Sequence, residues 1–472
     1  MPRDRIVALI VAVALFMENM DSTVIATSLP AIAADIGTHP LALKLAITSY
    51  LLSLAVFIPV SGWTADRFGA RNVFRTAIGV FVLGSIGCAL ASSLSDFVIA
   101  RAVQGAGGAM MTPVGRLVLV RTFDKRALVA AMAWVTIPAL IGPLIGPPVG
   151  GFITTYVSWH WIFLINVPIG LFGIVLASRY IENLRAEQPD PFDFFGMGLV
   201  GVGVGGLAFG LSVLGLHFLP QWIVVALIAV GFASTFAYVV YARRTKAPVL
   251  DLSLLAIPTL RASVLGGFVF RIGIGALPFL LPLMLQLGFD MTPFQSGLIT
   301  FSTALGAMGM KAAAAMVLRW FGFRTVLVVN ALISAGFLAA IGLFTSGTPV
   351  MLMIALLAIG GFFRSLQFTS INTIAYADLD RERMSRATSL VSVAQQLSIS
   401  SGVAVGALIV DLVSQYRAHP TLTADDFSIA FYGVALIAAS AALIFARLPR
   451  DAGAEMANRL PPPTEPRDQR PG

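Results

Sequence analysis

The chain has 472 residues, of which 57% are hydrophobic and 11% are charged. Soluble globular proteins have about 25% charged and about 45–50% apolar residues, so this composition excludes an ordinary soluble protein. A helix of about 20 apolar residues crosses a bilayer, and a chain built of such helices would have this composition. The formal net charge is +8. The basic residues lie scattered between apolar segments, which argues against a nucleic-acid-binding protein.

The cysteine and histidine content is low. Cys88 is the one cysteine, and there are four histidines. These numbers exclude a disulfide framework and a thiolate metal cluster, and we expect neither a metal nor a cofactor. The apolar segment at 6–16 follows basic residues and could also be a secretory signal. Further apolar segments follow it, so we expect an uncleaved first helix.

Apolar segments between polar breaks predict fourteen membrane-spanning helices. Irregular backbone cannot face hydrocarbon, so each segment is expected to be helical and the fold class is an all-α membrane protein. With ends uncertain by about 2–4 residues, the expected helices are 6–30, 43–63, 72–92, 97–120, 129–154, 161–180, 196–216, 220–241, 262–286, 293–318, 324–344, 349–376, 386–413 and 427–447.

Basic residues are concentrated in every second connection between these helices. Arg67 and Arg71 lie between the second and third helices and Lys125 between the fourth and fifth, whereas the connections at 92–95 and 345–349 have no Lys or Arg. Arg417, in the last outer connection, breaks the pattern. The positive-inside rule then places both termini in the cytoplasm.

The sequence contains an internal repeat. The segment RFGARNV at 67–73 recurs as WFGFRTV at 320–326, an offset of 253 residues. Glycines at 146 and 150 recur at 402 and 406, an offset of 256. Repeated halves are typical of one large class of transporters. We expect a six-helix half at 1–180, a linker with an inserted helix pair at 181–260, a second half at 261–447 and a disordered cytoplasmic tail at 448–472.

The segment GWTADRFGAR at 62–71 follows the second expected helix. It resembles the loop 2–3 signature of the major facilitator superfamily, in which the aspartate and the basic residues latch the two halves on the cytoplasmic side. The second copy has Arg319 where Asp66 stands, so the latch would be one-sided. A solubilising loop of the positive-inside kind is the alternative. The resemblance implies a conformational latch of Gly62, Asp66, Arg67, Gly69 and Arg71.

The fourth expected helix carries RAVQGAGG at 101–108. This segment resembles the second motif of the same superfamily, whose arginine is implicated in proton coupling in drug exporters. An arginine within a span costs a few kcal/mol and usually faces a cavity or a partner. The alternative is that Arg101 reaches outward to the interface, since Asp96 stands close to the helix start.

The fifth expected helix carries GPLIGPPVGG at 142–151. Glycines four residues apart form a smooth ridge that lets another helix approach closely, and prolines bend the helix. The segment resembles the motif that distinguishes antiporters from importers in the superfamily. A generic packing face is the alternative. The residues concerned are Gly142, Pro143, Gly146, Pro147, Gly150 and Gly151.

Further segments narrow the resemblance. DSTVI at 21–25 with SLP at 28–30, and WHWIFLINVPIG at 159–170, resemble signatures of the fourteen-span drug:proton antiporter family. Segments 107–116, 271–282 and 309–311 resemble multidrug exporters of the MdtD type. The resemblance covers the chain up to about residue 450 and is weakest in the inserted pair. It implies a major facilitator fold with 14 transmembrane helices, two six-helix halves and an inserted helix pair.

Charges within the helices are the candidates for chemistry. Glu18 and Asp21 are three residues apart in the first helix and therefore share a face. Two carboxylates in one dry site cannot both ionise easily, so one should hold a proton near neutral pH, which a proton-coupling site requires. With Arg101 they form the predicted proton-coupling set. A polar stripe packed against neighbouring helices is the alternative.

Arg271 is the expected counterpart of Asp21. The repeat offset places the equivalent of Asp21 at residue 274, within one turn of Arg271. We expect the two charges to face each other across a central cavity, and a structural salt bridge is the alternative. Arg116 and Lys311 could instead reach the cytoplasmic surface. The predicted substrate cavity comprises Arg271, Arg364, Gln367, Asn372, Gln104, Arg116 and Lys311.

These features predict a monomeric proton-coupled antiporter of the bacterial inner membrane. It would export small amphiphilic molecules or drugs by alternating access, with protons, the substrate and the lipid bilayer as its partners and no nucleic acid. The excess of basic groups in the cavity favours an organic anion, a metabolite or a zwitterion as the alternative substrate. An importer or uniporter of the same fold and a non-transporting sensor or scaffold remain open. The chain has no nucleotide-binding Gly-rich loop and no nucleophile–base motif, so we expect neither ATP hydrolysis nor an enzyme.

Overall fold

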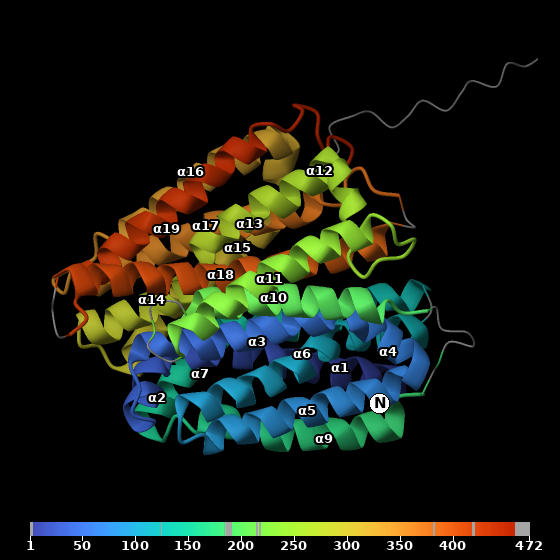
Figure 1. Cartoon of the computed structure of the whole chain (residues 1–472), viewed down its shortest axis with the longest axis horizontal. Helices are drawn as coiled ribbons and strands as arrows, with labels where there is room; N and C mark the ends of the chain where they lie inside the picture. Colours follow the sequence, from blue (N-terminus) through green and yellow to red (C-terminus); the bar gives the residue numbers. More distant parts are fainter. Residues whose placement is uncertain are drawn as a thin grey trace, which may run out of the picture.

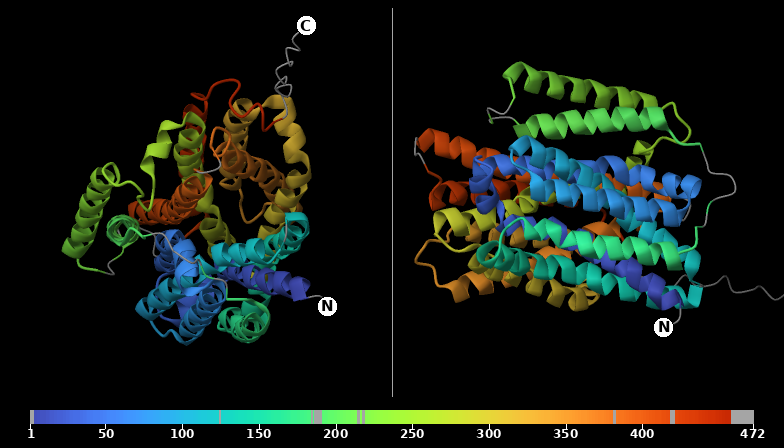
Figure 2. Two further views of the ribbon diagram at one scale, coloured as in Figure 1. Left: turned by 90° about the vertical axis from the view of Figure 1, so that its right-hand side faces the viewer. Right: turned by 90° about the horizontal axis from the view of Figure 1, so that it is seen from below.

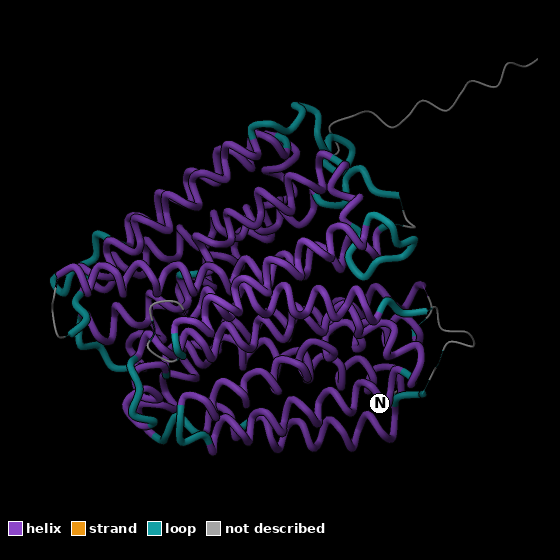
Figure 3. The backbone as a smooth tube through the Cα atoms, viewed as in Figure 1, coloured by secondary structure: helices purple, strands orange, loops and turns teal. Residues whose placement is uncertain are grey.

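The computed structural model describes residues 3–123, 125–183, 185, 191–213, 216, 219–380, 383–417 and 421–457. Within these residues it contains helices, turns and loops but no strand (Figure 3). Most of the expected tail at 448–472 lies outside the described residues. The prediction of an all-α protein is thus confirmed for the part of the chain that the structure describes.

The helices follow the expected apolar segments closely. The first part of the chain forms α1 (Arg3–Val24), α2 (Leu29–Asp35), α3 (Lys44–Phe57), α4 (Ser61–Phe68), α5 (Ala70–Leu90), α6 (Leu94–Thr122), α7 (Lys125–Tyr156), α8 (Trp161–Leu164) and α9 (Asn166–Tyr180). The middle forms α10 (Phe194–Val213) and α11 (Gln221–Ala242). The last part forms α12 (Pro258–Arg261), α13 (Gly267–Gly275), α14 (Leu277–Leu283), α15 (Pro293–Phe321), α16 (Phe323–Ile341), α17 (Val350–Ile374), α18 (Met384–Arg417) and α19 (Ala424–Phe445).

Eleven helical segments of the described chain are long and apolar enough to cross a membrane, and twelve if the bent helix α15 is one span. Two further helices are long enough to cross a membrane, since α6 has 29 residues and α7 has 32. Helix α6 carries several charged and polar residues within its length, among them Asp96, Arg101 and Gln104. The count of fourteen spans therefore stays a prediction.

The internal repeat reappears in the way the helices pack. In the first half α1 packs against α7 and α9, and α5 packs against α6. In the second half α13 packs against α18 and α19, and α16 packs against α17. The two bundles lie one above the other in Figure 1, blue to cyan below and yellow to red above. The packing supports two halves with an inserted pair, and the domain bounds remain predictions.

The halves meet along two seams, α7 against α15 and α3 against α18. At one seam a side chain added at Gly151 of α7 would collide with the backbone of Pro293 and Phe294. Two hydrogen bonds also cross between the halves. The Gln286 amide donates to the Thr27 carbonyl at 2.9 Å, and the Phe294 N–H donates to the Thr155 hydroxyl at 3.1 Å.

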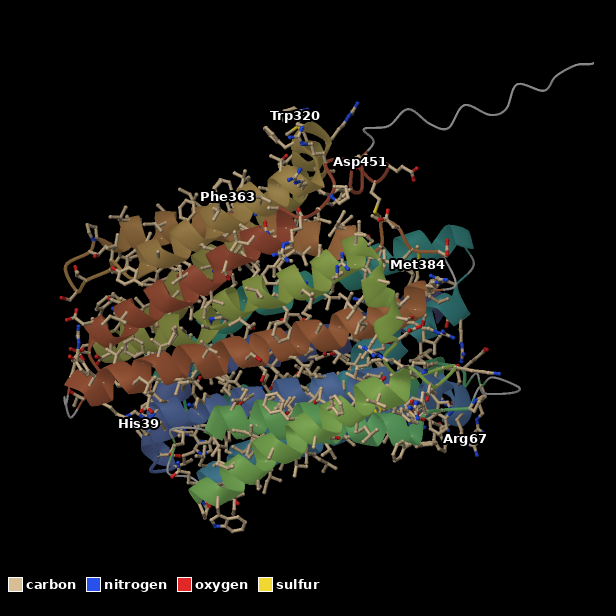
Figure 4. All side chains as sticks on the ribbon, turned by 45° about the horizontal axis from the view of Figure 1, so that its top comes forward. His39, Arg67, Trp320, Phe363, Met384 and Asp451 are labelled. Carbon is tan, nitrogen blue, oxygen red and sulfur yellow. The ribbon has the colours of Figure 1, made fainter. Side chains whose placement is uncertain are left out.

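These cross-links lie at the end of the molecule that carries α2, the end labelled His39 in Figure 4. From there α16 and α19 incline away from α5 and α9 toward the opposite end, where Arg67 and Met384 lie (Figures 1 and 4). The two halves therefore converge at the His39 end and diverge toward the Arg67 end.

The inserted pair covers one of the two seams. Helix α10 packs against both α3 and α18, and α11 lies outside it (Figure 2). Gly203, Gly206 and Gly210 of α10 form the ridge against α11, where added side chains would meet Thr235, Leu227 and Ile228. Close approach of this kind is the usual role of small residues between membrane helices.

Candidate functional site

The most enclosed charges of the first half form an ion pair. A guanidinium nitrogen of Arg101 in α6 lies 2.7 Å from a carboxylate oxygen of Asp21 in α1. The side chain of Arg101 is 1% exposed and that of Asp21 is 0% exposed. The alternative, in which Arg101 reaches outward to the interface, is therefore wrong, because its guanidinium is turned into the bundle.

Two side-chain amides complete the shell of Asp21. Gln104 of α6 donates to the carboxylate at 2.9 Å and Asn166 of α9 donates at 2.8 Å. Both amides also donate to the Ser85 hydroxyl of α5, at 2.6 and 3.2 Å. The oxygen of Gln104 accepts from Arg101 at 2.5 Å. We call Asp21, Arg101, Gln104, Asn166 and Ser85 the Asp21 cluster; it links four helices of one half.

The Asp21 cluster depends on close helix packing. The Arg101 guanidinium lies 4.2 Å from the ring centre of Tyr50 in α3, a cation–π contact that is strong where water is excluded. An added side chain at Gly84 would collide with the backbone of Gln104, and one at Gly105 with the Tyr50 carbonyl. The glycines of these helices therefore let the polar groups meet without a gap.

The carboxylate of a buried ion pair has two possible states. It is either ionised and paired with the arginine, or protonated and neutral. The low dielectric makes a charge without a partner costly, so Asp21 and Arg101 depend on each other. Adding a proton to Asp21 would remove the negative charge and leave the guanidinium with Gln104 and the Tyr50 ring.

Glu18 lies one turn away from this pair. It accepts a hydrogen bond from Thr112 of α6 at 2.8 Å and is partly exposed. The Tyr50 hydroxyl is buried and has no hydrogen-bond partner among the described residues. A side chain added at Gly108 would lie 3.2 Å from that hydroxyl and 3.6 Å from Glu18 Cγ. Tyr50 thus stands between the Arg101 guanidinium and the vicinity of Glu18.

One face of α6 carries polar side chains at intervals of four or eight residues, starting at Gln104 in the Asp21 cluster and continuing with Thr112 and Arg116. Gln104 is 0% exposed, Thr112 is half-buried and Arg116 is exposed. They share one helix face, and Gly108 fills the position between the first two. The face runs from the cluster toward the Arg67 end of the molecule.

The expectation that Asp21 and Arg271 face each other across a central cavity is wrong, because the Asp21 carboxylate is enclosed by Arg101, Gln104 and Asn166 of its own half. Arg271 of α13 donates instead to the Asn372 side chain of α17 at 2.7 Å and lies 5.6 Å from the Phe368 ring centre. No carboxylate of the described chain lies within 4.0 Å of Arg271, so a structural salt bridge is also wrong. Equivalent positions of a repeat each face the interior of their own half, which keeps these two charges apart.

The remaining predicted cavity residues do not form one site. Gln367 is 0% exposed and bonded to Asn330 and the Leu327 carbonyl, inside the second half. Arg364 lines a small cavity of that half. Lys311 on α15 and Arg116 on α6 are exposed. Gln104 belongs to the Asp21 cluster and Asn372 to Arg271.

The predicted latch residues lie at the Arg67 end. Asp66 of α4 forms an ion pair with Arg121 of α6, which belongs to the same half. Gly69 has φ of 93° and turns the chain from α4 into α5, a conformation that favours glycine. Arg67 lies near the ring of Trp63. The ion pair of Asp66 therefore fastens helices within one half, because α6 ends beside α4.

The glycine ridge of α7 has two partners. Side chains added at Gly142, Gly146 and Gly150 would collide with α1, whereas one at Gly151 would collide with α15 of the other half. Pro143 and Pro147 lie within the helix. The Pro147 carbonyl accepts from the Thr27 hydroxyl at 3.4 Å. The ridge thus joins α1 to the seam between the halves.

Sequence reasoning missed Tyr50, Ser85 and Asn166 as members of this site. Their signal was present, since each is a polar side chain within an apolar segment. Asn166 also stands in the segment 159–170, which was noted for its resemblance but not for this side chain.

Comparison with known proteins identifies the family. The family model described as Major Facilitator Superfamily matches residues 11–260 and 263–470. The chain is 40% identical over 456 residues to "Putative multidrug resistance protein MdtD" of Enterobacter sp. (strain 638), covering 94% of each chain. It is 38% identical over 448 residues to the protein of the same name in Salmonella paratyphi B, again covering 94% of each.

Solved structures show the same fold. A D-xylose–proton symporter superposes with a TM-score of 0.67 at 15% identity, covering 95% of this chain and 98% of the symporter. A bacterial homologue of the human lysosomal transporter Spinster, inward-facing and unoccupied, superposes with a TM-score of 0.65 at 14% identity, covering 98% and 99%. These neighbours confirm the predicted fold. The family model and the relatives place the chain among transporters rather than enzymes. The chain belongs to the Major Facilitator Superfamily and is a multi-pass membrane transporter.

Proposed function

We propose that the protein is a proton-coupled antiporter that exports small amphiphilic molecules or drugs across the bacterial inner membrane as a monomer. The observation that carries this proposal is the Asp21–Arg101 pair, a protonatable group held against a fixed cation inside the bundle. The multidrug names of the relatives support the substrate class. The positive-inside pattern supports cytoplasmic termini.

The proton would bind and leave at Asp21. Protonation of Asp21 breaks its salt bridge to Arg101, and release of the proton restores it. The packing of α1 against α6 would therefore change with the protonation of Asp21. Asp21 is fully enclosed by its own half, so its proton needs a polar route to water. The Tyr50 hydroxyl, Glu18 and Thr112 supply that route toward the Arg67 end, which we assign to the cytoplasm.

Alternating access would use the contacts between the halves. The hydrogen bonds of Gln286 to Thr27 and of Phe294 to Thr155 hold the His39 end together. Opening toward that side requires these bonds to break and the contact of Gly151 with Pro293 and Phe294 in the α7–α15 seam to loosen. The Asp66–Arg121 ion pair, whose two residues lie on α4 and α6, would hold the Arg67 end of the first half together more firmly in this access state than in the other.

The environment of Arg271 supports organic anions or zwitterionic metabolites as a second class of substrate. Arg271 is 1% exposed and has an amide rather than a carboxylate as its partner. A cation without a carboxylate would attract an organic anion or a zwitterionic metabolite. We keep export of such a molecule as the alternative.

Proteoliposomes with an imposed pH gradient test the proposal. The substrate panel comprises dyes, quaternary amines, tricarboxylates and amino-acid metabolites. We expect gradient-driven movement of at least one class by the wild-type protein and its loss in Asp21→Asn, with Asp451→Asn, an exposed acid after α19, as matched control. Equal movement by Asp21→Asn, without a gradient, would show that proton antiport through Asp21 is wrong.

A further inference from the structure

The second half holds more positive than negative charge within its helices. Between residues 258 and 374 the sequence has one acidic residue, Asp290, and it lies between α14 and α15. The same stretch places Arg271, Lys311 and Arg364 within helices. Cations in a membrane-spanning bundle normally pair with carboxylates or carbonyls. The acids of this stretch cannot balance its cations.

Arg364, whose side chain is partly exposed, lines a small cavity of the second half. The cavity lies between α13, α16 and α17 and is lined by Ile274, Ser334, Leu338, Leu357, Gly360 and Arg364 among others. Its free volume is about 10 Å³ for the centre of a water-sized sphere. That is the lower limit for one water molecule, so a monatomic anion would enter only if the lining side chains give way slightly. An organic substrate does not fit into it.

Two polar side chains of this cavity lack partners. The Ser334 side chain is 2% exposed, and its hydroxyl has no hydrogen bond in the part of the chain that the structure describes. Within the same residues Arg364 has no carboxylate within 4.0 Å and no hydrogen-bond acceptor. Both are donors, and guanidinium and hydroxyl groups together bind anions well.

The internal repeat explains why the donors are unmatched. With the offset of 253 residues, Ile274 takes the place of Asp21, Leu338 that of Ser85 and Leu357 that of Gln104. The cavity is therefore the counterpart of the Asp21 cluster in the other half. A carboxylate neutralises Arg101 in the first half, whereas an apolar side chain stands at the equivalent place beside Arg364.

We propose that a small monovalent anion, chloride, binds between Arg364 and Ser334 and neutralises the guanidinium inside the second half. The anion supplies the negative charge that Asp21 supplies in the first half. The site is separate from proton coupling, because none of its residues contacts the Asp21 cluster in the described chain. Chloride would thus be a structural ligand that stabilises the packing of α13, α16 and α17.

Thermal unfolding of the purified protein tests this site. The melting midpoint is measured in chloride and in gluconate at equal ionic strength, so that screening of surface charges is the same. We expect a saturable rise with chloride for the wild type, since a ligand of the folded state stabilises it. Arg364→Gln should raise the half-saturating chloride concentration at least tenfold, and Ser334→Ala severalfold. Arg319→Gln, which removes an exposed arginine from the end of α15, should keep the wild-type response.

A second measurement does not depend on the folding of a variant. Wild-type crystals grown with bromide should show anomalous density beside the Arg364 guanidinium. A midpoint equal in chloride and gluconate, an unchanged half-saturation in Arg364→Gln, or bromide density elsewhere only would overturn the proposal. Neither measurement uses a substrate or a gradient, so its failure would leave proton-coupled export standing, and the converse also holds.

Discussion

Asp21 and Arg101 form an ion pair of 2.7 Å in which neither side chain is more than 1% exposed. Both belong to the same half, so rocking of the halves against each other does not by itself separate them. In the proposed mechanism, protonation of Asp21 would separate them, because it removes the charge that Arg101 neutralises. Proton binding at Asp21 would thereby be coupled to the packing of α1 against α6.

The first prediction concerns the stability of this pair. Arg101→Ala leaves a buried carboxylate without its cation, and we expect a loss of about 3–5 kcal/mol in the free energy of unfolding. Asp21→Asn combined with Arg101→Gln should recover most of that loss, because no charge is left unpaired. Unfolding in detergent of the wild type, of Asp21→Asn, of Arg101→Gln and of the double variant, read as a double-mutant cycle, measures the coupling. Additive losses would contradict the dependence of one residue on the other.

The second prediction concerns the proton route. Tyr50→Phe keeps the ring beneath Arg101 and removes the hydroxyl, and Glu18→Gln keeps the shape and removes the proton acceptor. We expect both to slow gradient-driven transport while substrate binding stays unchanged, because Asp21 itself is intact. Transport rate against pH and equilibrium binding are the two readouts. Unchanged rates in both variants would show that protons reach Asp21 by another path.

The third prediction concerns the Arg67 end. Asp66→Asn and Arg121→Gln remove the two ends of one ion pair, so each should shift the balance between the two access states in the same direction. Distances between spin labels at the two ends of the molecule report that balance. Substrate binding should persist in both variants. Opposite shifts would mean that Asp66 acts through a partner other than Arg121.

The fourth prediction concerns the seam between the halves. Gly151→Ala would collide with the backbone of Pro293 and Phe294, and overpacking of this kind costs about 1–3 kcal/mol. We expect lower thermal stability and slower transport. The matched control is Gly198→Ala on α10, where an added side chain meets nothing within 4 Å. Equal effects of the two substitutions would rule out a special role of the α7–α15 seam.

The fifth prediction separates the two substrate classes. Arg271→Ala removes a buried cation whose partner is the Asn372 amide. Transport of anions should fall more than transport of cations, since only anions would be attracted by the guanidinium. Initial rates for one member of each class in proteoliposomes give the ranking. The reverse ranking would contradict the anion alternative.

The residues of the site were easier to predict than their partners. Asp21 and Arg101 are conspicuous because charged side chains are costly within apolar segments. Which cation meets Asp21 depends on how distant helices pack, and the repeat offset favoured Arg271 wrongly. The offset relates positions that face the interior of separate halves, so it identifies equivalents and not contacts. Asn166 was missed because an amide in an apolar segment shows its purpose only when α9 packs against α1.

The role of the glycines on α7 was also predictable only in part, because the sequence shows which glycines share a helix face but not which helix that face meets. Spacing of four residues at Gly142, Gly146 and Gly150 indicates one face of a helix, and that face packs on α1. The adjacent Gly151 lies on a different face, and only the assembled fold shows that this face meets the other half.

Proton release on substrate binding tests the central claim most directly. A substrate found with the proteoliposome panel is added to the purified protein in weakly buffered solution with a pH indicator. If substrate and proton exchange through Asp21, the wild-type protein releases protons and Asp21→Asn releases none while still binding the substrate. Release by Asp21→Asn equal to that of the wild type would contradict proton coupling at Asp21.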